Sequence, residues 1–360
     1  MGGTFGLNGT GRIGRLLIRK AFAQKTPEFA LTAINSIHPA KTIAHLLKYD
    51  STHGRWHADI AANDRQIMIN GHVVEVVCEH DPARIPWQKL GVDVVIDATG
   101  KFTSRKDAAK HLAAGASTVI VTAPGSDLDL TVVMGVNQHR YKPQRHALLS
   151  AASCTTICAA PVLDILDQAF QVKNGWLTTV HAFTNDQNHL DNPHRDLRRA
   201  RSCFHSIIPT TTGIGKALTD VLPHLAPVVR GVSIRVPVPD VSLIDLTVQV
   251  KKSVTKEAAE AAFRQAAAAN YARYVALSDE PLVSTDFIGC EKSAVIDGLS
   301  LNAGGGLVKV LAWYDNEWAY ACRVAELANY VAAATRKEMK ENGGDCHGRN
   351  VVGNRRVQVL

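Results

Sequence analysis

A glycine-rich turn near the N-terminus constrains the fold of this chain more than any other feature. Gly9-Thr10-Gly11-Arg12-Ile13-Gly14 follows a short apolar run, residues 4–8, and opens a stretch with helical spacing, residues 13–23. In this setting Gly9, Gly11 and Gly14 allow a tight strand-to-helix turn and let backbone N–H groups approach a pyrophosphate. The helix N-terminus adds a partial positive charge. The alternative is an ordinary glycine-rich turn, but the context favours a dinucleotide site.

Strand-like and helix-like stretches alternate through the first 150 residues. This alternation predicts an α/β fold with a doubly wound parallel sheet of the Rossmann type. Asn70-Gly71 additionally predicts a hairpin turn between two short strands. The expected strands are residues 29–35, 66–69, 73–77, 92–98 and 118–122, and the expected helices are residues 40–49 and 106–114.

The second half of the chain has longer β-rich runs and fewer helices. These runs, residues 177–182, 232–238, 242–251 and 307–312, predict an α+β domain with a mixed, largely antiparallel sheet. We therefore expect a dinucleotide-binding domain over residues 1–153 and a catalytic domain over residues 154–317. A final helix, residues 318–336, is expected to pack back on the first domain. Residues 337–360 are expected to form a tail, loose over residues 342–353.

Composition excludes several classes of protein. The chain has 360 residues, of which 46% are apolar and 20% charged, so it can bury a sizeable core. No apolar run approaches the roughly 20 residues of a membrane helix, and residues 1–5 do not resemble a signal peptide. Seven cysteines, an odd number, indicate a reducing compartment. We therefore expect a cytoplasmic protein without a membrane partner.

The net charge of +7 has one dense basic cluster, which contains Arg195, Arg198, Arg199 and Arg201. This cluster is either a solvated surface or a site for an anionic ligand. A nucleic acid partner is disfavoured, because basic residues do not interleave with aromatic residues. The cluster lies within residues 184–206, a polar stretch without periodicity. A loop of that length inside a compact domain usually has a function.

The choice of dinucleotide depends on the end of the second expected strand. NAD-binding sites commonly place a carboxylate there for the ribose 2′-hydroxyl, but this chain has Ser36. A serine can donate a hydrogen bond to the 2′-phosphate of NADP, which a carboxylate would repel. The sequence therefore favours NADP, or tolerance of both cofactors. Alternatively, Ser36 is a turn residue and NAD binds without the acidic contact.

A cysteine and a histidine form the candidate catalytic pair. Cys154 lies among Ser and Thr residues just before an expected helix, where the helix dipole favours the thiolate. His181 ends a β-rich run and could activate this nucleophile. The alternative, a buried structural cysteine, describes Cys158 better. Because thiol proteases also use such a pair, the two residues alone do not choose the reaction. No C-x-x-C pair is present, so we expect no metal site.

Eight blocks of sequence together resemble the phosphorylating glyceraldehyde-3-phosphate dehydrogenases, most closely bacterial members that include NADP-preferring enzymes. The similarity covers nearly all of residues 4–335. The blocks are NGTGRIGR (8–15), HLLKYDSTHGRW (45–56), SCTT (153–156), TNDQ (184–187), PHRDLRRAR (193–201), IIPTTTG (207–213), RVPVPDVSLIDL (235–246) and WYDNEW (313–318).

The resemblance implies a function and a set of site residues. Cys154 would form a thiohemiacetal with glyceraldehyde 3-phosphate, His181 would act as the base, and inorganic phosphate would cleave the resulting thioester. The implied homotetramer would serve glycolysis or gluconeogenesis. Cofactor contacts are implied for Arg12, Ile13, Thr99, Gly100, Thr122 and Asn316. Phosphate contacts are implied for Thr184 and Arg235, and for Ser153, Thr155, Arg201, Thr212 and Gly213.

Several positions depart from the family pattern. Ala151 and Ile157 replace two asparagines that flank the nucleophile, and Thr10 stands where phenylalanine is common. His80 occupies a position often held by arginine, which in NADP users could meet the 2′-phosphate. Two alternatives stay open. One is the sister enzyme, erythrose-4-phosphate dehydrogenase; the other, motivated by Ala151 and Ile157, is a catalytically weakened paralogue that acts as a binding protein. Thr184 and its neighbours favour the triose phosphate.

Overall fold

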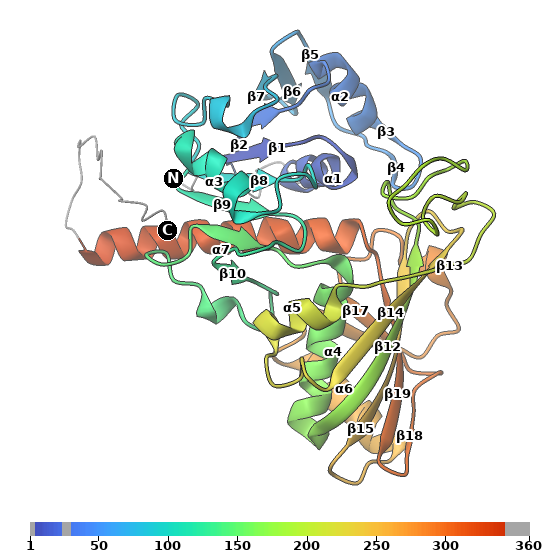
Figure 1. Ribbon diagram of the computed structural model, residues 1–360. Helices are drawn as coiled ribbons and strands as arrows, with labels where there is room; N and C mark the ends of the chain where they lie inside the picture. The colour runs from blue at the N-terminus through green and yellow to red at the C-terminus, as the bar shows by residue number, and fades with distance from the viewer. Residues whose placement is uncertain (1–3, 24–29, 343–360) are drawn as a thin grey trace.

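The computed structural model describes residues 4–23 and 30–342, which form two β-sheets with a long helix between them (Figure 1). The first sheet has nine strands in the order β10-β11-β9-β8-β1-β2-β7-β6-β5. Neighbours are parallel from β10 to β7, and β7, β6 and β5 pair antiparallel. The strands are β1 (Thr4–Asn8), β2 (Ala30–Asn35), β5 (Ile60–Ala62), β6 (Gln66–Ile69), β7 (His72–Val77), β8 (Val94–Asp97), β9 (Thr118–Val121), β10 (Leu130–Thr131) and β11 (Leu148–Ser150).

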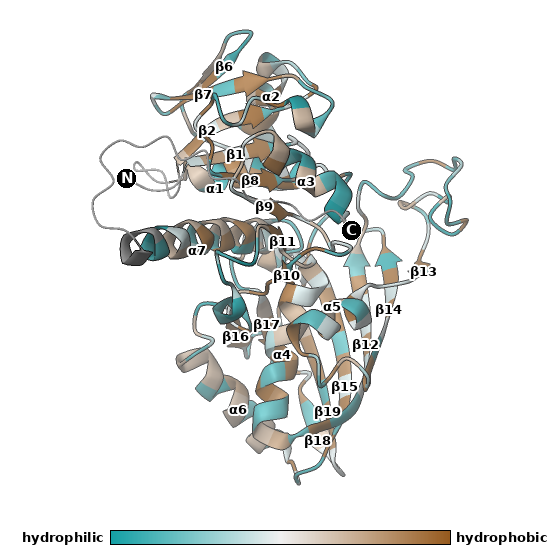
Figure 2. Cartoon of the chain, turned by 60° about the vertical axis from the view of Figure 1, so that its left-hand side comes forward, coloured by the Kyte–Doolittle hydropathy of each residue, from teal (hydrophilic) through white to brown (hydrophobic). Residues whose placement is uncertain are grey.

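The predicted Rossmann-type sheet is confirmed, and its pattern of burial explains why it forms. Every residue of β8 and β9 is buried, as expected for strands covered on both faces. In Figure 2, β8 and β9 are mostly brown, the colour of apolar residues. The hairpin predicted at Asn70-Gly71 joins β6 to β7. The accompanying helices are α1 (Arg12–Ala21), α2 (Ala40–Lys48) and α3 (Arg105–Ala113), and a small ribbon pairs β3 (Tyr49–Asp50) with β4 (Gly54–Arg55).

The second sheet has the order β13-β14-β12-β15-β19-β17-β16, and β18 pairs with β19. It is mixed and largely antiparallel, as predicted, with parallel pairs only at β12–β14 and β16–β17. The strands are β12 (Val172–Ala182), β13 (Ile208–Thr210), β14 (Val229–Val236), β15 (Ser242–Val250), β16 (Val275–Ser278), β17 (Ala294–Asp297), β18 (Asn302–Gly304) and β19 (Leu307–Tyr314).

Three helices accompany this sheet: α4 (Cys154–Phe170), α5 (Ile214–Val221) and α6 (Lys256–Ala268). Helix α4 is almost wholly buried and contacts β12, β15, β17 and β19. Its first residue therefore lies where the second sheet meets the loops of the first. Short 3-10 turns occur at Pro82–Arg84, Gln138–Arg140 and Ser284–Phe287.

The last helix, α7 (Trp318–Asn342), contacts α1 and β8 on one side and α4 on the other (Figure 1). It runs past Arg336, where the sequence predicted its end, so the first six residues of the expected tail are helical. The loose stretch predicted over residues 342–353 lies almost entirely outside the described residues. Within residues 4–23 and 30–342, no helix combines the length and apolarity that a membrane span requires.

The predicted long loop is present, since no helix or strand occurs between Ala182 and Ile208. It projects from the body of the molecule beside β13 in both views (Figures 1 and 2). Its side chains include the exposed Leu190 and Leu197, which are 76% and 81% accessible.

Candidate active site

Cys154 is the first residue of α4, as the sequence predicted. Ser153 caps the helix, because its hydroxyl accepts a hydrogen bond from the backbone N–H of Thr156 at 3.2 Å. The preceding Ala152 is fully buried and has a φ of +57°, a conformation that L-residues seldom adopt. Such strain persists only where the surroundings enforce it, and it is common beside functional groups. The turn thus fixes the direction of the Cys154 side chain.

His181, near the end of β12, lies directly opposite this cysteine. Its Nε2 is 3.3 Å from Sγ of Cys154, although 27 residues separate the two in sequence. Its Nδ1 is 2.7 Å from the carbonyl oxygen of Ala182. The same Nδ1 is 3.0 Å from Nη1 of Arg235, which can only donate. The contact with the Ala182 carbonyl, which can only accept, is the shorter of the two, so it favours a proton on Nδ1 and a lone pair on Nε2 toward the sulfur. This tautomer makes His181 a base aimed at the thiol.

Arg235 on β14 borders the pair. Strands β12 and β14 place it beside His181 in register, and its Nη1 donates to the Ala182 carbonyl at 3.0 Å. Burial, reinforced by the charge of Arg235, lowers the pKa of His181 to about 3. Burial raises the pKa of the Cys154 thiol, and Arg235 opposes that rise. The stabilisation of the thiolate expected from the helix dipole is therefore outweighed, and the ligand-free pair is neutral.

The long loop contributes a different arginine from the one expected. Arg201 is 67% exposed in its side chain and pairs with Asp191. Arg199 is only 17% exposed, pairs with Asp186, and its charge lowers the pKa of both His181 and Arg235. The structure therefore brings Arg199 to the pair and leaves Arg201 on the surface. Spacing in the run Arg198-Arg199-Ala200-Arg201 did not distinguish these residues.

The remaining residues of the expected phosphate sites lie on segments around this pair. Thr184 follows β12, and Thr212 and Gly213 connect β13 to α5. All three are partly or fully exposed, as a ligand contact requires. Thr155 instead is buried, and its hydroxyl is hydrogen-bonded to the hydroxyl of Tyr314 at 3.1 Å. The Tyr314 hydroxyl is also hydrogen-bonded to that of Thr179, at 2.9 Å. The Thr155 hydroxyl thus points into the interior in this structure.

The glycine-rich turn has the geometry that a dinucleotide needs. Gly9 has a φ of +98°, which favours glycine. A Cβ on Gly14 would lie 2.1 Å from the carbonyl oxygen of Gly9, so the helix can approach the strand only without a side chain. A Cβ on Gly11 would meet nothing within 4 Å, so open space lies above the turn. Arg12 and Ile13 then begin α1, whose N-terminus faces this space.

A buried network that the sequence did not reveal supports the neighbouring turn. Asp97, at the end of β8, accepts hydrogen bonds from the backbone N–H and hydroxyl of Thr99 at 3.0 and 2.6 Å. Its other oxygen is 3.0 Å from Nε2 of His111, whose Nδ1 accepts from the indole N–H of Trp87. The indole bond fixes the proton of His111 on Nε2. Thr99 is thereby held in place, together with the adjacent Gly100.

Ser36 lies at the end of β2, beside the glycine-rich turn. It is buried, and its hydroxyl is 2.7 Å from that of Thr10. The side chain of Asn35 bonds both the N–H and the carbonyl of Glu79 at 2.9 Å, which brings the exposed His80 to the same edge of the sheet. Thr122, which follows β9, is held by a bond from its N–H to the Asp97 carbonyl at 2.9 Å.

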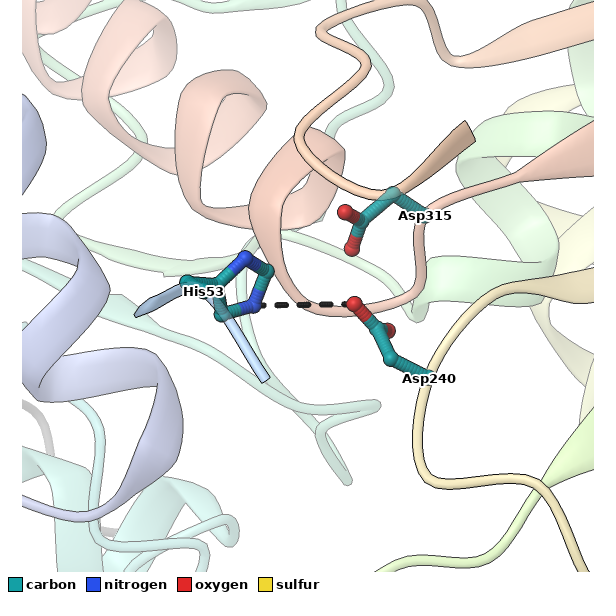
Figure 3. A group of neighbouring side chains, drawn as sticks. All are labelled: His53, Asp240 and Asp315. Atoms are coloured by element: carbon teal, nitrogen blue, oxygen red, sulfur yellow. Dashed lines mark ion pairs between the residues drawn. The ribbon is translucent and has the colours of Figure 1, made fainter. Parts of the chain in front are cut away.

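A charged cluster joins the two halves of the site. Arg12 is bonded to Asp50 and Glu317, and Nε2 of His53 lies 3.1 Å from Glu317. The same nitrogen is 3.5 Å from Oδ2 of Asp240, whose carboxyl points toward His53 (Figure 3). These contacts tie the loop that follows α2 to the segment between β19 and α7.

Asp240 and Asp315 face each other in this cluster. Their oxygens and a nitrogen of His53 lie within 4.8 Å of one another, a spacing that a metal ion could use. Both oxygens of Asp315 already accept backbone N–H groups, one from Gly289 and the other from Glu317 and the first residue of α7. Burial and the nearby carboxylates raise the pKa of Asp240 to about 9, so a proton occupies this cluster at neutral pH.

Comparison with known proteins identifies the family to which this fold belongs. The family model of the glyceraldehyde 3-phosphate dehydrogenase NAD binding domain matches residues 4–105, and that of the C-terminal domain matches residues 153–316. Glyceraldehyde-3-phosphate dehydrogenase 2 of Bacillus subtilis (strain 168) is 50% identical over 328 residues, which cover 91% of this chain and 96% of the relative. Glyceraldehyde-3-phosphate dehydrogenase of Geobacillus stearothermophilus is 49% identical over 329 residues, with 91% and 98% coverage.

The chain belongs to the glyceraldehyde-3-phosphate dehydrogenase family. The resemblance recognised in the sequence is thus confirmed, and the chain has the family's NAD-binding domain. Ala151 and Ile157, which depart from the family pattern, are 4% and 2% accessible and pack in the main core. Apolar side chains are well suited to these positions, so the departures leave the nucleophile in place.

A second cysteine–histidine contact occurs in this member of the family. Sγ of Cys203 is 3.4 Å from Nδ1 of His189, and both residues belong to the long loop. Cys203 is buried, and this burial raises the pKa of its thiol. Unlike Cys154, it does not begin a helix; it lies within the long loop, two residues after the exposed Arg201. The contact therefore offers a matched control for the chemistry of Cys154 and His181.

Proposed function

We propose that this protein is a phosphorylating glyceraldehyde-3-phosphate dehydrogenase, which converts glyceraldehyde 3-phosphate, phosphate and NAD(P)+ to 1,3-bisphosphoglycerate and NAD(P)H. The observation that carries this proposal is the contact of 3.3 Å between Sγ of Cys154 and Nε2 of His181. The short contact of Nδ1 of His181 with the Ala182 carbonyl favours the tautomer in which Nε2 is the proton acceptor. Family membership then selects this reaction over the thiol protease that the pair alone would allow.

In the first step, Sγ of Cys154 attacks the aldehyde carbon, and the thiol proton passes through Nε2 of His181 to the carbonyl oxygen, which gives a thiohemiacetal and leaves His181 neutral again. His181 then takes the hydroxyl proton as the carbon loses a hydride, which leaves a thioester on Cys154. Bound NAD(P)+ supplies the hydride acceptor. Covalent attachment retains the oxidation energy in the thioester. Attack by phosphate on the thioester carbon returns the electron pair to the sulfur and releases the acyl phosphate.

Two anionic groups must be held during this sequence. Thr184 and Arg235 would bind the phosphate of the triose, and Ser153, Thr212 and Gly213 would contact the attacking phosphate. Arg199 takes the role expected of Arg201, because its charge reaches His181. Guanidinium groups and hydroxyls suit phosphate oxygens. Binding an anion would also offset the charges of Arg235 and Arg199, which add to the effect of burial in lowering the pKa of His181.

For the cofactor, we propose a preference for NADP. Ser36 brings no negative charge to the ribose edge, and the exposed His80 lies at the same edge. The space above Gly11 fits a pyrophosphate, and Gly9, Gly14, Arg12 and Ile13 would surround it. Thr99, Gly100, Thr122 and Asn316 lie on segments that would contact the rest of the dinucleotide.

We also propose that the protein is a homotetramer in the cytoplasm, where it would serve glycolysis or gluconeogenesis. The exposed apolar side chains of the long loop, Leu190 and Leu197, support an interface between subunits. Trp176 on β12 is 67% accessible on the outer face of the second sheet and supports a further interface. Light scattering of the purified protein would measure the number of subunits.

The activity is tested by following reduction of NAD and of NADP, each with glyceraldehyde 3-phosphate and with or without phosphate. We expect both cofactors to be reduced, and the reduction to depend strictly on phosphate. At equal, low cofactor concentrations, NADP should be reduced faster than NAD. Erythrose 4-phosphate serves as the competing substrate. Higher kcat/KM with erythrose 4-phosphate would assign the alternative dehydrogenase. Cofactor binding without reduction of either substrate would identify the weakened paralogue.

A further inference from the structure

Ser242 is a buried hydroxyl that lies between the two halves of the catalytic centre. It is the first residue of β15, which pairs with β12 on one side and β19 on the other. Its side chain is 1% accessible. Its Oγ accepts a hydrogen bond from the backbone N–H of Ala182, the residue whose carbonyl fixes His181.

The second bond of this hydroxyl reaches Asn316. Oγ of Ser242 lies 2.6 Å from Oδ1 of Asn316. A distance this short is typical of O–H···O bonds and shorter than N–H···O bonds usually are. Since the N–H of Ala182 already donates to the serine oxygen, the single proton of the hydroxyl is free for Oδ1. The amide of Asn316 therefore has its oxygen toward Ser242 and its NH2 group turned away.

We propose that Ser242 is a positioning residue, which orients the amide of Asn316 as a hydrogen-bond donor toward the carboxamide of the nicotinamide ring. This inference rests on the cofactor role proposed for Asn316. A flipped amide would present an acceptor to the carboxamide oxygen and lose the bond. Through Ala182, the same hydroxyl also fixes the strand end that carries His181, so the base and the ring contact share one support.

The backbone on both sides supports this role. Val241, immediately before Ser242, has a φ of +63° and is 3% accessible. A β-branched residue in this conformation is a true outlier, and such strain persists only where the surroundings impose it. Asn316 is held between Asp315, which accepts the N–H of Gly289, and Glu317, which bonds Arg12. The main chain around both residues is thus fixed, and the hydroxyl sets the remaining rotation of the amide.

The test measures binding of two ligands by calorimetry, without aldehyde. NAD(P) contains the nicotinamide ring, and ADP-ribose (or its 2′-phosphate, to match NADP) lacks it. We expect Ser242→Ala to weaken NAD(P) on the order of tenfold, the effect of one lost hydrogen bond plus an unpaired buried N–H. Binding of ADP-ribose should stay within about twofold of the wild type, because Asn316 does not touch it.

Ser233→Ala provides the matched control. Ser233 is a buried serine of strand β14, which lies on the far side of β12 in the same sheet, and its hydroxyl has no hydrogen-bond partner among the described residues. We expect this variant to bind both ligands as the wild type does. If Ser242→Ala does not fold, Ser242→Cys keeps the size of the side chain with only a weak donor.

A double-mutant cycle decides whether the effect passes through Asn316. In an Asn316→Ala background, Ser242→Ala should weaken NAD(P) by less than about twofold further. Equal loss of NAD(P) and ADP-ribose would overturn the proposal, as would no loss at all or an undiminished loss in the Asn316→Ala background. Because these readouts need no substrate, failure of glyceraldehyde 3-phosphate oxidation leaves the test of Ser242 intact.

Discussion

The hydroxyl of Thr10 lies 2.7 Å from the hydroxyl of Ser36, and both side chains are buried. Thr10 belongs to the glycine-rich turn and Ser36 directly follows β2, so one hydrogen bond joins two segments that would border the ribose in the proposed binding mode. Both residues depart from the types common in the family. Neither side chain carries a charge, so the position at the end of β2 where NAD-binding sites commonly have a carboxylate has none, which is the basis of the proposed cofactor preference.

Ser36→Asp should therefore shift the preference toward NAD. A carboxylate at this edge would repel the 2′-phosphate of NADP and would accept a hydrogen bond from the 2′-hydroxyl of NAD. We therefore expect the ratio of kcat/KM with NADP to kcat/KM with NAD to fall about tenfold or more. Ser36→Asn is the matched control, since it has the shape of aspartate without the charge. An unchanged ratio in Ser36→Asp would show that another residue selects the cofactor.

His181→Asn should slow formation of the acyl-enzyme by roughly 10²–10⁴-fold, the range of general base catalysis. The tautomer with Nε2 free is lost, while Cys154 and the cofactor contacts remain. Rapid-mixing measurement of the first turnover would isolate this step. His189→Asn, which disrupts the other cysteine–histidine contact, should leave the rate unchanged. Equal losses in both variants would remove the special role of His181.

Gly14→Ala and Gly11→Ala should separate stability from cofactor binding. A Cβ at Gly14 would lie 2.1 Å from a carbonyl oxygen, so this variant should lose about 1–3 kcal/mol of unfolding free energy. A Cβ at Gly11 meets nothing, so that variant should keep its melting temperature and bind NAD(P) at least about tenfold more weakly, because the methyl group enters the proposed pyrophosphate space. Calorimetry would measure both quantities. Normal cofactor affinity in Gly11→Ala would place the dinucleotide elsewhere.

Asp240→Asn should stabilise the protein, and more so as the pH rises. The pKa of Asp240 is raised to about 9, mainly by burial and then by the carboxylates of Asp315 and Glu317, with His53 facing the same carboxyl. Between the ordinary pKa of aspartate, about 3.9, and this raised value, the folded state binds more protons than the unfolded state. The free energy of unfolding therefore falls as the pH rises through this window, and asparagine removes that loss.

Melting curves from pH 5 to pH 8 would check this expectation. The gain in melting temperature of Asp240→Asn over the wild type should grow across the series. Asp64→Asn is the control, because the Asp64 side chain is 93% exposed and should show a constant difference. A gain that is independent of pH, or a loss at pH 8, would contradict the assignment of a bound proton to Asp240.

Local patterns in the sequence were sufficient for much of the fold. The apolar runs at β8 and β9 predicted buried parallel strands, and the Gly9–Gly14 turn predicted the dinucleotide site. Cys154 was recognisable because Ser and Thr residues precede an apolar helix. In each case the signal lies within a few consecutive residues, where periodicity and turn chemistry determine the structure.

Features that depend on distant segments were not predictable in this way. Asp97 and His111 come from separate elements that only the folded sheet brings together, and Ser242 meets Asn316 across two strands. The choice between Arg199 and Arg201 depends on the path of the long loop, which has no periodicity. The burial of the Cys154 thiol was also not predicted. It raises the pKa of this thiol, whereas the helix dipole alone was expected to lower it.

The central claim is that Cys154 forms a covalent thioester which inorganic phosphate cleaves. The most direct test is the steady-state reduction of NAD(P) with glyceraldehyde 3-phosphate and phosphate by Cys154→Ala, with Cys158→Ala as the control one helical turn further along α4. We predict that Cys154→Ala binds NAD(P) but shows no turnover, whereas Cys158→Ala stays active. Substantial phosphate-dependent reduction by Cys154→Ala would contradict the covalent mechanism.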